Sequence, residues 1–492
     1  MFNITLRIFM AAIIMTTTSL LTLTEVTAEV TAEVTAESKA VPSKFEKIDN
    51  LIESAMAEYR IPGASVGIVK NDQTIYMKGF GISGPDKTAV TPQTPFVLGS
   101  TSKSITAAAI MLLVDKGNID LDSPVQRYLP WFRLSDPDAS KKITVKHLLH
   151  QTSGISTYDG QAPLTEGDKS LEEHLKGLNK VQLISSVGAS FHYSNVNYDT
   201  LGGIVQAVSG MTFTNYVQQN IFKPLEMNHS YGSPEEATKN GLATGYNSVF
   251  GFMLPTKQMR HEGTIPSGYL ISSAEDMSNY LIAHMNKGTF KANNVFSENS
   301  VRLMHEPASK MWGDHYYAMG WAVHNNTISH DGSTENTYSK MQIDGEYGIV
   351  ILINAMDNFH IDDYNTIMSN INLILHNQEP IAVTKEYTKK YIVLDLFVLT
   401  AVLFTLYSIY SLFNKKNSKK VSKLRSVMNG LFIFVFYLLL PSTLLLLLPK
   451  FLVPWPVVLL FLPGIGHTLL ILPFVLLVVG TIKTAIAVRK LT

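Results

Sequence analysis

Residues 96–107 of the chain read FVLGSTSKSITA, an apolar run that ends in a glycine and passes directly into a helical pattern. The Ser-Thr-Ser sequence at residues 100–102 consists of residue types that commonly cap a helix N-terminus. Behind it, apolar residues recur at helical spacing until Gly117. This stretch therefore predicts a capped helix that is buried in the protein.

Lys103 follows Ser100 by three residues, so one turn of helix places the lysine amine beside the serine hydroxyl. No other Ser-x-x-Lys pair occurs in the chain. A serine nucleophile needs an adjacent base, and burial lowers the pKa of a lysine enough for the amine to serve as one. A structural helix with a polar cap explains the same residues, and this stretch alone leaves both interpretations open.

The composition of the chain excludes several classes of function. The 492 residues carry 40 basic and 40 acidic side chains, so the net charge is zero and nothing favours a nucleic-acid partner. Cysteine is absent. Disulfides, thiol catalysis and cysteine-ligated metals are therefore excluded.

The N-terminal segment, residues 1–37, resembles a secretory signal followed by a repeat linker. Arg7 precedes a short apolar run at residues 8–15, and the sequence Val-Thr-Ala-Glu then occurs three times. Each Val-Thr-Ala offers a small-residue cleavage site, while an uncleaved anchor is the alternative. Either interpretation predicts that the following domain is exported.

A helix and a β-hairpin are predicted next, at residues 43–59, 64–69 and 74–80. Ser65 lies in a Gly-x-Ser-x-Gly pattern, but a nucleophile elbow requires a strand, a sharp turn and then a helix. We therefore interpret Ser65 as a strand residue. Further along, His147 and His150 lack the sequence pattern of a metal site, and capping or packing roles are predicted for them.

Two further short motifs carry groups suited to catalysis. Tyr193 and Asn195 lie two residues apart in a predicted loop, where a hydroxyl can move a proton and an amide can hold a substrate carbonyl. His330 begins a His-x-Gly pattern that also occurs at His261. Three antiparallel strands are predicted at residues 317–323, 339–343 and 348–354, and His330 is favoured because it lies among them. A helix at residues 361–376 is expected to close this domain.

Three apolar segments end the chain, at residues 392–413, 427–448 and 457–482, and each is long enough to span a bilayer. Prolines and glycines in the third predict that its span begins late or is kinked. Lysines and arginines cluster in the loop after the first span and at the C-terminus. The positive-inside rule makes both cytoplasmic and places the domain before residue 380 outside the cytoplasm, in agreement with the predicted signal.

Taken in order, three motifs resemble those of the serine β-lactamase and DD-peptidase superfamily, in the branch of class C β-lactamases, D-aminopeptidases and related esterases: Ser100-x-x-Lys103, Tyr193-x-Asn195 and His330-x-Gly332. The resemblance implies a β-lactamase-like α+β fold for residues 38–379, with an antiparallel sheet flanked by helices and a helical subdomain that carries Tyr193. The three spans of residues 380–492, which resemble a membrane-anchored subgroup of prodrug-activating D-peptidases, then follow.

The resemblance also implies a mechanism. Ser100 is expected to be the acylated nucleophile, with Lys103 and Tyr193 sharing the general base role. The backbone amides of Ser100 and Ser333 are expected to form the oxyanion hole, and Asn195 to hold a substrate amide. His330, Gly332 and Ser333 are counted with the substrate-binding residues. No metal or organic cofactor is implied.

The substrate class follows from the same comparison. We expect a small peptide, ester or prodrug-like substrate, in which the amide or ester bond that is cleaved lies beside a D-amino acid. Many penicillin-binding enzymes carry a lysine at the position of His330, and a histidine is mostly neutral at pH 7, which argues against strong penicillin binding. A β-lactamase or penicillin-binding protein is therefore the second hypothesis, and a non-catalytic sensor of cell-wall peptides is the third.

Overall fold

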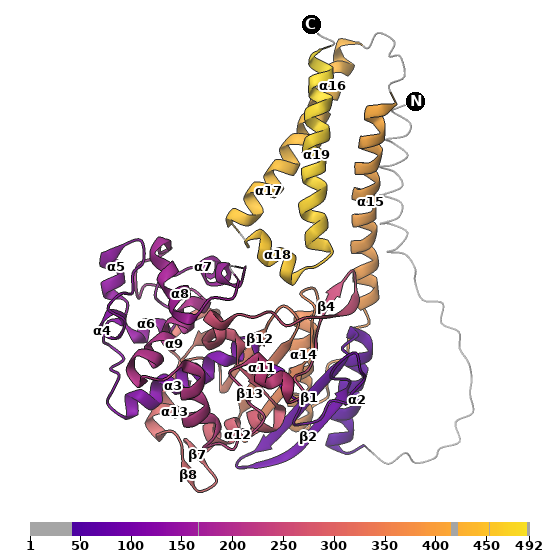
Figure 1. Ribbon diagram of the computed structural model, residues 1–492. Coiled ribbons are helices and arrows are strands. Elements are labelled where there is room, and N and C mark those ends of the chain that lie inside the picture. Colours follow the sequence, from indigo (N-terminus) through magenta and orange to yellow (C-terminus); the bar gives the residue numbers. More distant parts are fainter. Residues whose placement is uncertain (1–41, 166, 415–421, 452, 490–492) are drawn as a thin grey trace, which may run out of the picture. The chain divides into compact units, whose positions relative to one another are not determined.

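The computed structural model describes residues 42–165, 167–414, 422–451 and 453–489 (Figure 1). The predicted signal and repeat linker, residues 1–37, lie outside the described residues. Residues Lys44–Thr492 form one compact unit. The boundary between a catalytic domain and a membrane domain at residues 379 and 380 stays a prediction.

An eight-stranded sheet in which every neighbouring pair is antiparallel forms the centre of the fold, as the α+β prediction requires. In spatial order its strands are β2 (Gln73–Gly81), β1 (Gly63–Lys70), β14 (Tyr347–Ile353), β13 (Tyr338–Asp344), β12 (Thr327–Ser333), β11 (Ala322–His324), β10 (His315–Tyr317) and β9 (Ser309–Trp312). The predicted hairpin is confirmed as β1 and β2, and Ser65 is confirmed as a residue of β1.

The two faces of the sheet are covered by different helices (Figure 1). Successive side chains of a strand point to opposite faces, so Ile351 of β14 joins one apolar core and Leu352 joins the other. The first core includes α2 (Lys44–Tyr59) and α14 (Ile361–Leu375), both of which were predicted. The second includes α12 (Ala274–Met285) and α3 (Ser102–Asp115).

The predicted buried helix is confirmed as α3, but its predicted cap is wrong. A 3₁₀ turn, η1 (Gly99–Thr101), precedes the helix, and no side chain caps either element. Thr101 Oγ1 donates to Leu98 O, and Ser102 Oγ accepts from the amide of Leu270. The side chains of Thr101 and Ser102 are buried, so their hydroxyls bind neighbouring segments instead of the helix terminus.

Short helices between α3 and the later strands form the predicted helical subdomain. They are α4 (Val125–Tyr128), α5 (Pro137–Lys142), α6 (Val145–Leu149), α7 (Thr157–Gln161), η2 (Ala162–Thr165), α8 (Leu171–Lys176), η3 (Gly177–Lys180), α9 (Asn195–Ser209), α10 (Phe213–Val217) and η4 (Gln218–Phe222). His147 forms a capping box with Thr144 at the start of α6, which confirms its predicted capping role. Tyr193 lies in the loop before α9, and Asn195 is the first residue of that helix.

The prediction of three strands between residues 317 and 354 is wrong in number. The region contains five strands, β10 to β14, of which β13 and β14 confirm the second and third predictions. The first predicted strand is divided into β10 and β11, because residues 318–321 leave the sheet at Gly320, whose φ is +78°. The His330 motif was predicted to lie between strands and instead lies within β12. The sequence of β12, TISHDGS, mixes polar and small residues, so apolar and polar residues do not alternate along it. Alternation is the sequence signal for a half-buried strand, and β12 was therefore not predicted.

The remaining helices and strands before residue 380 lie outside the eight-stranded sheet. A small sheet contains β15 (Ala355–Met356), β4 (Gly245–Val249) and β5 (Phe252–Thr256), with β15 and β4 parallel. The others are β3 (Phe96–Val97), α11 (Pro234–Lys239), η5 (Glu262–Thr264), η6 (Ile265–Tyr269), β6 (Ile271–Ser272), β7 (Thr289–Phe290), β8 (Asn293–Asn294) and α13 (Glu298–His305).

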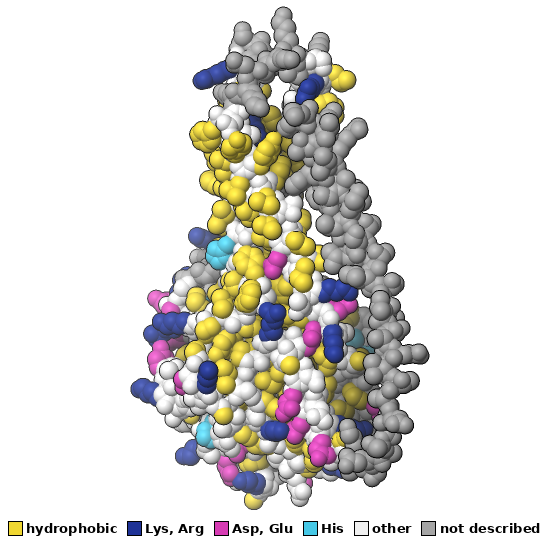
Figure 2. All heavy atoms as spheres, turned by 90° about the vertical axis from the view of Figure 1, so that its right-hand side faces the viewer, with side chains coloured by type: hydrophobic (Ala, Val, Ile, Leu, Met, Phe, Trp, Pro, Cys, Tyr) yellow, Lys and Arg dark blue, Asp and Glu magenta, His cyan; other side chains and the backbone are white. Residues whose placement is uncertain are grey.

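Three helices in the described C-terminal region are long and apolar enough to cross a membrane: Tyr387–Phe413, Leu424–Lys450 and Ile465–Val488. In order the elements are α15 (Tyr387–Phe413), α16 (Lys423–Ile433), η7 (Phe434–Leu439), α17 (Leu440–Phe451), α18 (Trp455–Phe461) and α19 (Ile465–Val488). The third span begins late, as predicted, because the helix is interrupted between the end of α18 and the start of α19. Apolar side chains gather over these helices (Figure 2).

Gly320 provides a test of how closely the strands and α3 are packed. A Cβ at this position would lie 2.6 Å from Ser104 Cα and 2.7 Å from Lys103 O. Gly320→Ala should therefore lower the melting temperature of the protein in detergent more than Gly117→Ala does. Gly117 has a similar φ of +72° but open space around it, so its substitution costs only the backbone strain, about 1–2 kcal/mol. Equal melting temperatures for the two variants would contradict this close packing.

Candidate active site

Ser100 is held against the end of β12 by the residues around it. Gly99 has φ +57°, and a Cβ there would lie 2.5 Å from the amide nitrogen of Ser333. Ser339 Oγ donates to Leu98 O over 2.5 Å, which ties β13 to the segment before η1. Only glycine permits this backbone conformation together with so close an approach. The turn therefore places Ser100 beside the end of β12.

Lys103 is completely buried, and its amine is surrounded by three oxygen atoms. Nζ lies 2.9 Å from Ser100 Oγ, 2.8 Å from Asn195 Oδ1 and 2.6 Å from Ser267 O. A neutral amine has two N–H donors and one lone pair. The amide oxygen and the carbonyl oxygen can each accept one N–H, which leaves the lone pair for the hydroxyl proton of Ser100. The arrangement suits a neutral lysine that acts as a base.

The pKa of Lys103 supports this arrangement. Burial lowers the pKa to about 7, although the charges of Asp199 and Asp331 oppose the shift. A lysine in water keeps a pKa above 10 and is almost wholly charged at pH 7. Near neutral pH a substantial fraction of Lys103 is therefore the free amine, which is the form that can take a proton.

Tyr193 covers the other side of the lysine. Nζ of Lys103 lies 4.8 Å from the centre of the Tyr193 ring. Burial is the main reason that the pKa of Tyr193 is raised well above 10, and the nearby side chain of Ser100 only partly opposes this. Tyr193 is consequently a phenol and not a phenolate at neutral pH. It is suited to passing on a proton that it receives.

The backbone amide of Ser333 faces the same space as Ser100. Thr334 N donates to Thr337 O, so these two residues form a hydrogen-bonded pair at the β12–β13 turn. Neighbouring pairs in an antiparallel ladder alternate, which turns the N–H of Ser333 away from β13. On that side β11 pairs only with residues 327–329. The amides of Ser100 and Ser333 can therefore receive a developing negative charge.

His330 lies beneath the site and not on its surface. Its Nδ1 is 2.6 Å from Asp331 O, and its Nε2 is 3.3 Å from the hydroxyl of Tyr317. Burial is the main reason that its pKa falls to about 4, which makes the ring neutral. Because both nitrogens already have partners, the ring supports Tyr317 and Tyr193 and does not offer a free cation to a substrate.

The structure brings the predicted residues Ser100, Lys103, Tyr193, Asn195, His330, Gly332 and Ser333 together at one place. A Cβ on Gly332 would lie 2.7 Å from the amide nitrogen of Ser100, so this glycine permits β12 to approach. The alternative His261 is buried against Tyr269, and no partner is found for either ring nitrogen among the described residues.

Sequence reasoning missed two groups that surround Lys103. Ser267 contributes its backbone oxygen, and a contact made by the backbone cannot be predicted from a pattern of side chains. Ser267 lies in η6, shortly after the His261 pattern, over which the His330 pattern was favoured. Asp199 is buried and pairs with His174 at 3.1 Å, and its charge has the larger effect of the two carboxylates that oppose the lowering of the lysine pKa. Its place one helical turn after Asn195 was the available signal.

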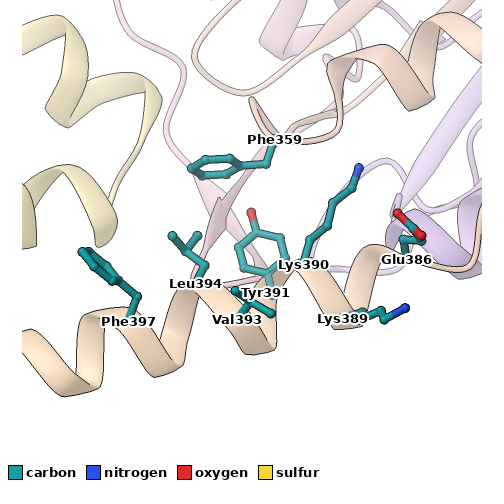
Figure 3. A pocket seen from close by; sticks show the side chains of 8 residues that line it. All are labelled: Phe359, Glu386, Lys389, Lys390, Tyr391, Val393, Leu394 and Phe397. Atoms are coloured by element: carbon teal, nitrogen blue, oxygen red, sulfur yellow. The ribbon is translucent and has the colours of Figure 1, made fainter. Parts of the chain in front are cut away.

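A cavity of about 580 Å³ lies elsewhere, between α15 and the loop at Phe359 (Figure 3). None of the residues that line it belongs to the group around Ser100. Within the described ranges, no cluster of three or more His, Asp or Glu side chains is placed to hold a metal ion.

Comparison with known proteins agrees with this geometry. Residues 48–367 match the Beta-lactamase family, and the chain belongs to that family. Protein flp from Staphylococcus aureus (strain MW2) is 30% identical over 319 residues, which are 63% of this chain and 63% of that protein. Penicillin-binding protein 4 from Amycolatopsis lactamdurans is 25% identical over 316 residues, 61% of this chain and 81% of that protein. The chain thus spans less than two thirds of Protein flp.

Solved structures show the same fold. The octameric penicillin-binding protein homologue from Pyrococcus abyssi superposes with a TM-score of 0.60 at 26% identity, over 70% of this chain and 80% of that one. FmtA from Staphylococcus aureus superposes with a TM-score of 0.57 at 23% identity, over 69% of this chain and 93% of that one. The second likeness concerns the fold alone.

The lysine pKa predicts how the reactivity of Ser100 depends on pH. The rate at which a fluorophosphonate labels Ser100 should rise between about pH 5 and pH 9, because the fraction of free amine increases with pH. The midpoint should lie near 7. Lys103→Arg keeps a permanent charge, so its labelling should be slower by roughly 100-fold. A rate that does not change with pH in the unsubstituted protein would contradict a role for the neutral lysine.

Proposed function

We propose that the protein is a membrane-anchored serine hydrolase that cleaves amide or ester bonds through an acyl-enzyme on Ser100. One observation carries this proposal: the amine of a fully buried lysine lies 2.9 Å from the serine hydroxyl, with its other two hydrogen bonds directed to fixed acceptors. A capped structural helix has no use for this arrangement, because burying a lysine without a carboxylate partner is costly.

In the first step, the hydroxyl proton of Ser100 passes to Lys103 while Oγ bonds to the acyl carbon of the substrate. The amides of Ser100 and Ser333 stabilise the negative charge on the carbonyl oxygen. Tyr193 then gives its phenolic proton to the leaving amine or alcohol and takes the proton held by Lys103. The bond to the leaving group breaks, and the acyl group remains on Ser100.

In the second step, water attacks the acyl-enzyme, and the lysine and tyrosine accept its proton and return one to Oγ. The product is the free acid, and Ser100 is restored. The side-chain amide nitrogen of Asn195 is the group best placed to hold a substrate carbonyl, because its oxygen is already bound to Lys103.

For the substrate we propose small peptides or esters that contain a D-amino acid, by analogy with the superfamily. A β-lactamase or penicillin-binding activity is the alternative, and the relative called Penicillin-binding protein 4 favours it. The neutral, internally bonded His330 argues against it, because a substrate carboxylate would find no cation there. The positive-inside rule supports a catalytic domain outside the cytoplasm with a cytoplasmic C-terminus.

Labelling of the full chain in detergent tests the proposed nucleophile. The protein should gain one phosphonyl group after exposure to a fluorophosphonate, measured by intact-mass spectrometry, and Ser100→Ala should gain none. A penicillin should give little or no adduct under the same conditions. A stable penicillin adduct on Ser100 would favour the alternative activity. Folded protein that reacts with neither reagent would favour the non-catalytic sensor.

A further inference from the structure

Strand β4 is hydrogen-bonded both to the turn beside the site and to the C-terminal helices. Its residue Tyr246 donates its backbone N–H to Asn336 O at 3.1 Å and to Asn354 O at 2.8 Å. Asn336 belongs to the β12–β13 turn, residues 334–337, which directly follows Ser333. The backbone of β4 is thus bonded to the β12–β13 turn. This turn begins one residue after Ser333, whose amide is expected to contribute to the oxyanion hole.

Asn247 is the side chain of β4 that reaches in both directions. Its Nδ2 donates to Glu335 O at 2.6 Å and to Leu460 O of α18 at 3.2 Å, and its side chain is buried. The backbone oxygen of Glu335 lies two residues beyond Ser333. A single amide group therefore bonds both the β12–β13 turn and a helix of the membrane region.

Ser248, the next residue of β4, points to the opposite face of the strand and reaches α15. Its Oγ lies 2.6 Å from the hydroxyl of Tyr391, which also donates to the carboxylate of Asp357. Figure 3 shows Tyr391 projecting from α15 beside the cavity, on the side of Phe359. The turn after β4 adds a further attachment, because Tyr387 of α15 donates to Gly251 O at 3.2 Å.

Helix α18 also contacts a segment on the Tyr193 side of the site. It contacts η2, which follows α7 directly. Thr157 of α7 donates to the backbone oxygen of Tyr193 at 2.6 Å. The membrane region is thus in contact with segments next to both Ser333 and Tyr193, although neither residue touches it directly.

We propose that β4 couples the docking of α15 and α18 to the β12–β13 turn, and that Asn247 is a positioning residue for the Ser333 amide. On this view the C-terminal helices help to set the geometry of the site as well as anchoring the protein. The inference rests on the proposed function, because it concerns the rate of acyl transfer. A displacement of about 1 Å in a catalytic group is enough to slow an enzyme substantially.

Substitution of Asn247 in the full chain, reconstituted in lipid nanodiscs, tests the proposal. Asn247→Ala and Asn247→Asp both remove the two donated hydrogen bonds, and the second keeps the shape of the side chain. With a small ester substrate, each variant should lose roughly tenfold in kcat with little change in KM. Each should also discriminate less between the ester and the matching thionoester, because sulfur is the weaker acceptor for the oxyanion amides.

Asn358→Ala is the matched control. Asn358 donates to Phe461 O of α18 at 2.6 Å, but it makes no bond to the β12–β13 turn. Its substitution weakens the attachment of α18 but keeps the bond from Asn247 to the turn, so it should lower kcat and the thionoester ratio by clearly less than either Asn247 variant does. Unchanged kcat in both Asn247 variants would overturn the proposal, as would an equal loss in Asn358→Ala.

A double substitution tests whether the effect comes from the membrane region. Phe461→Ala removes an apolar contact between α18 and the catalytic core, and it should lower kcat. In the Asn247→Ala background it should lower kcat no further, since the connection is already broken. Independent effects of the two substitutions would overturn the coupling. Fluorophosphonate labelling separates the two hypotheses: an unlabelled Ser100 refutes the proposed function, whereas a labelled Ser100 with unchanged kcat refutes only the role of Asn247.

Discussion

The burial of the Lys103 amine is the constraint on which the rest of the structure depends. A charged ammonium in an apolar interior is costly, so the amine must lose its proton or find acceptors for its hydrogens. This protein does both: three oxygens lie within hydrogen-bonding distance, and burial lowers the lysine pKa to about 7. The three oxygens come from η1, from α9 and from η6, which is why these segments converge.

The architecture follows from bringing those segments together. The eight-stranded sheet supplies β12, whose end lies against η1, and the helical subdomain supplies Tyr193 and Asn195. Each part contributes a different property of the site. The sheet holds backbone amides in a fixed position, and the helical subdomain excludes water from the lysine. Burial of the site shapes both side chains, because the same burial that lowers the pKa of Lys103 raises the pKa of Tyr193.

Much of this could be predicted from the sequence, since Ser100, Lys103, Tyr193, Asn195 and His330 lie in short motifs with fixed spacing. Long helices with regular apolar periodicity, such as α2 and α14, were also predicted well. The surroundings of the lysine were not. Ser267 acts through a backbone oxygen, which no side-chain pattern indicates. Asp199 acts on the lysine pKa through its charge, and its spacing of four residues from Asn195 was the one sign of it in the sequence. The strand β12 was missed because its faces do not alternate between polar and apolar residues.

The same limit explains why the role of the membrane helices was not apparent. Their apolar sequences predict spans, and nothing in them indicates a bond to the catalytic domain. The connection runs through Asn247 and the backbone oxygen of Leu460, a pair separated by 213 residues. Such long-range contacts between backbone groups and buried amides depend on the tertiary structure, so they cannot be predicted from local sequence.

The central claim is that Lys103 is the base that activates Ser100, and a direct titration of its amine tests that claim. Isotope-labelled lysine followed by NMR as a function of pH reports the protonation of each amine, and Lys103→Arg identifies the signal by its loss. The account predicts that the Lys103 signal titrates with a pKa of about 7. A Lys103 that stays protonated up to the ordinary pKa of lysine would contradict it.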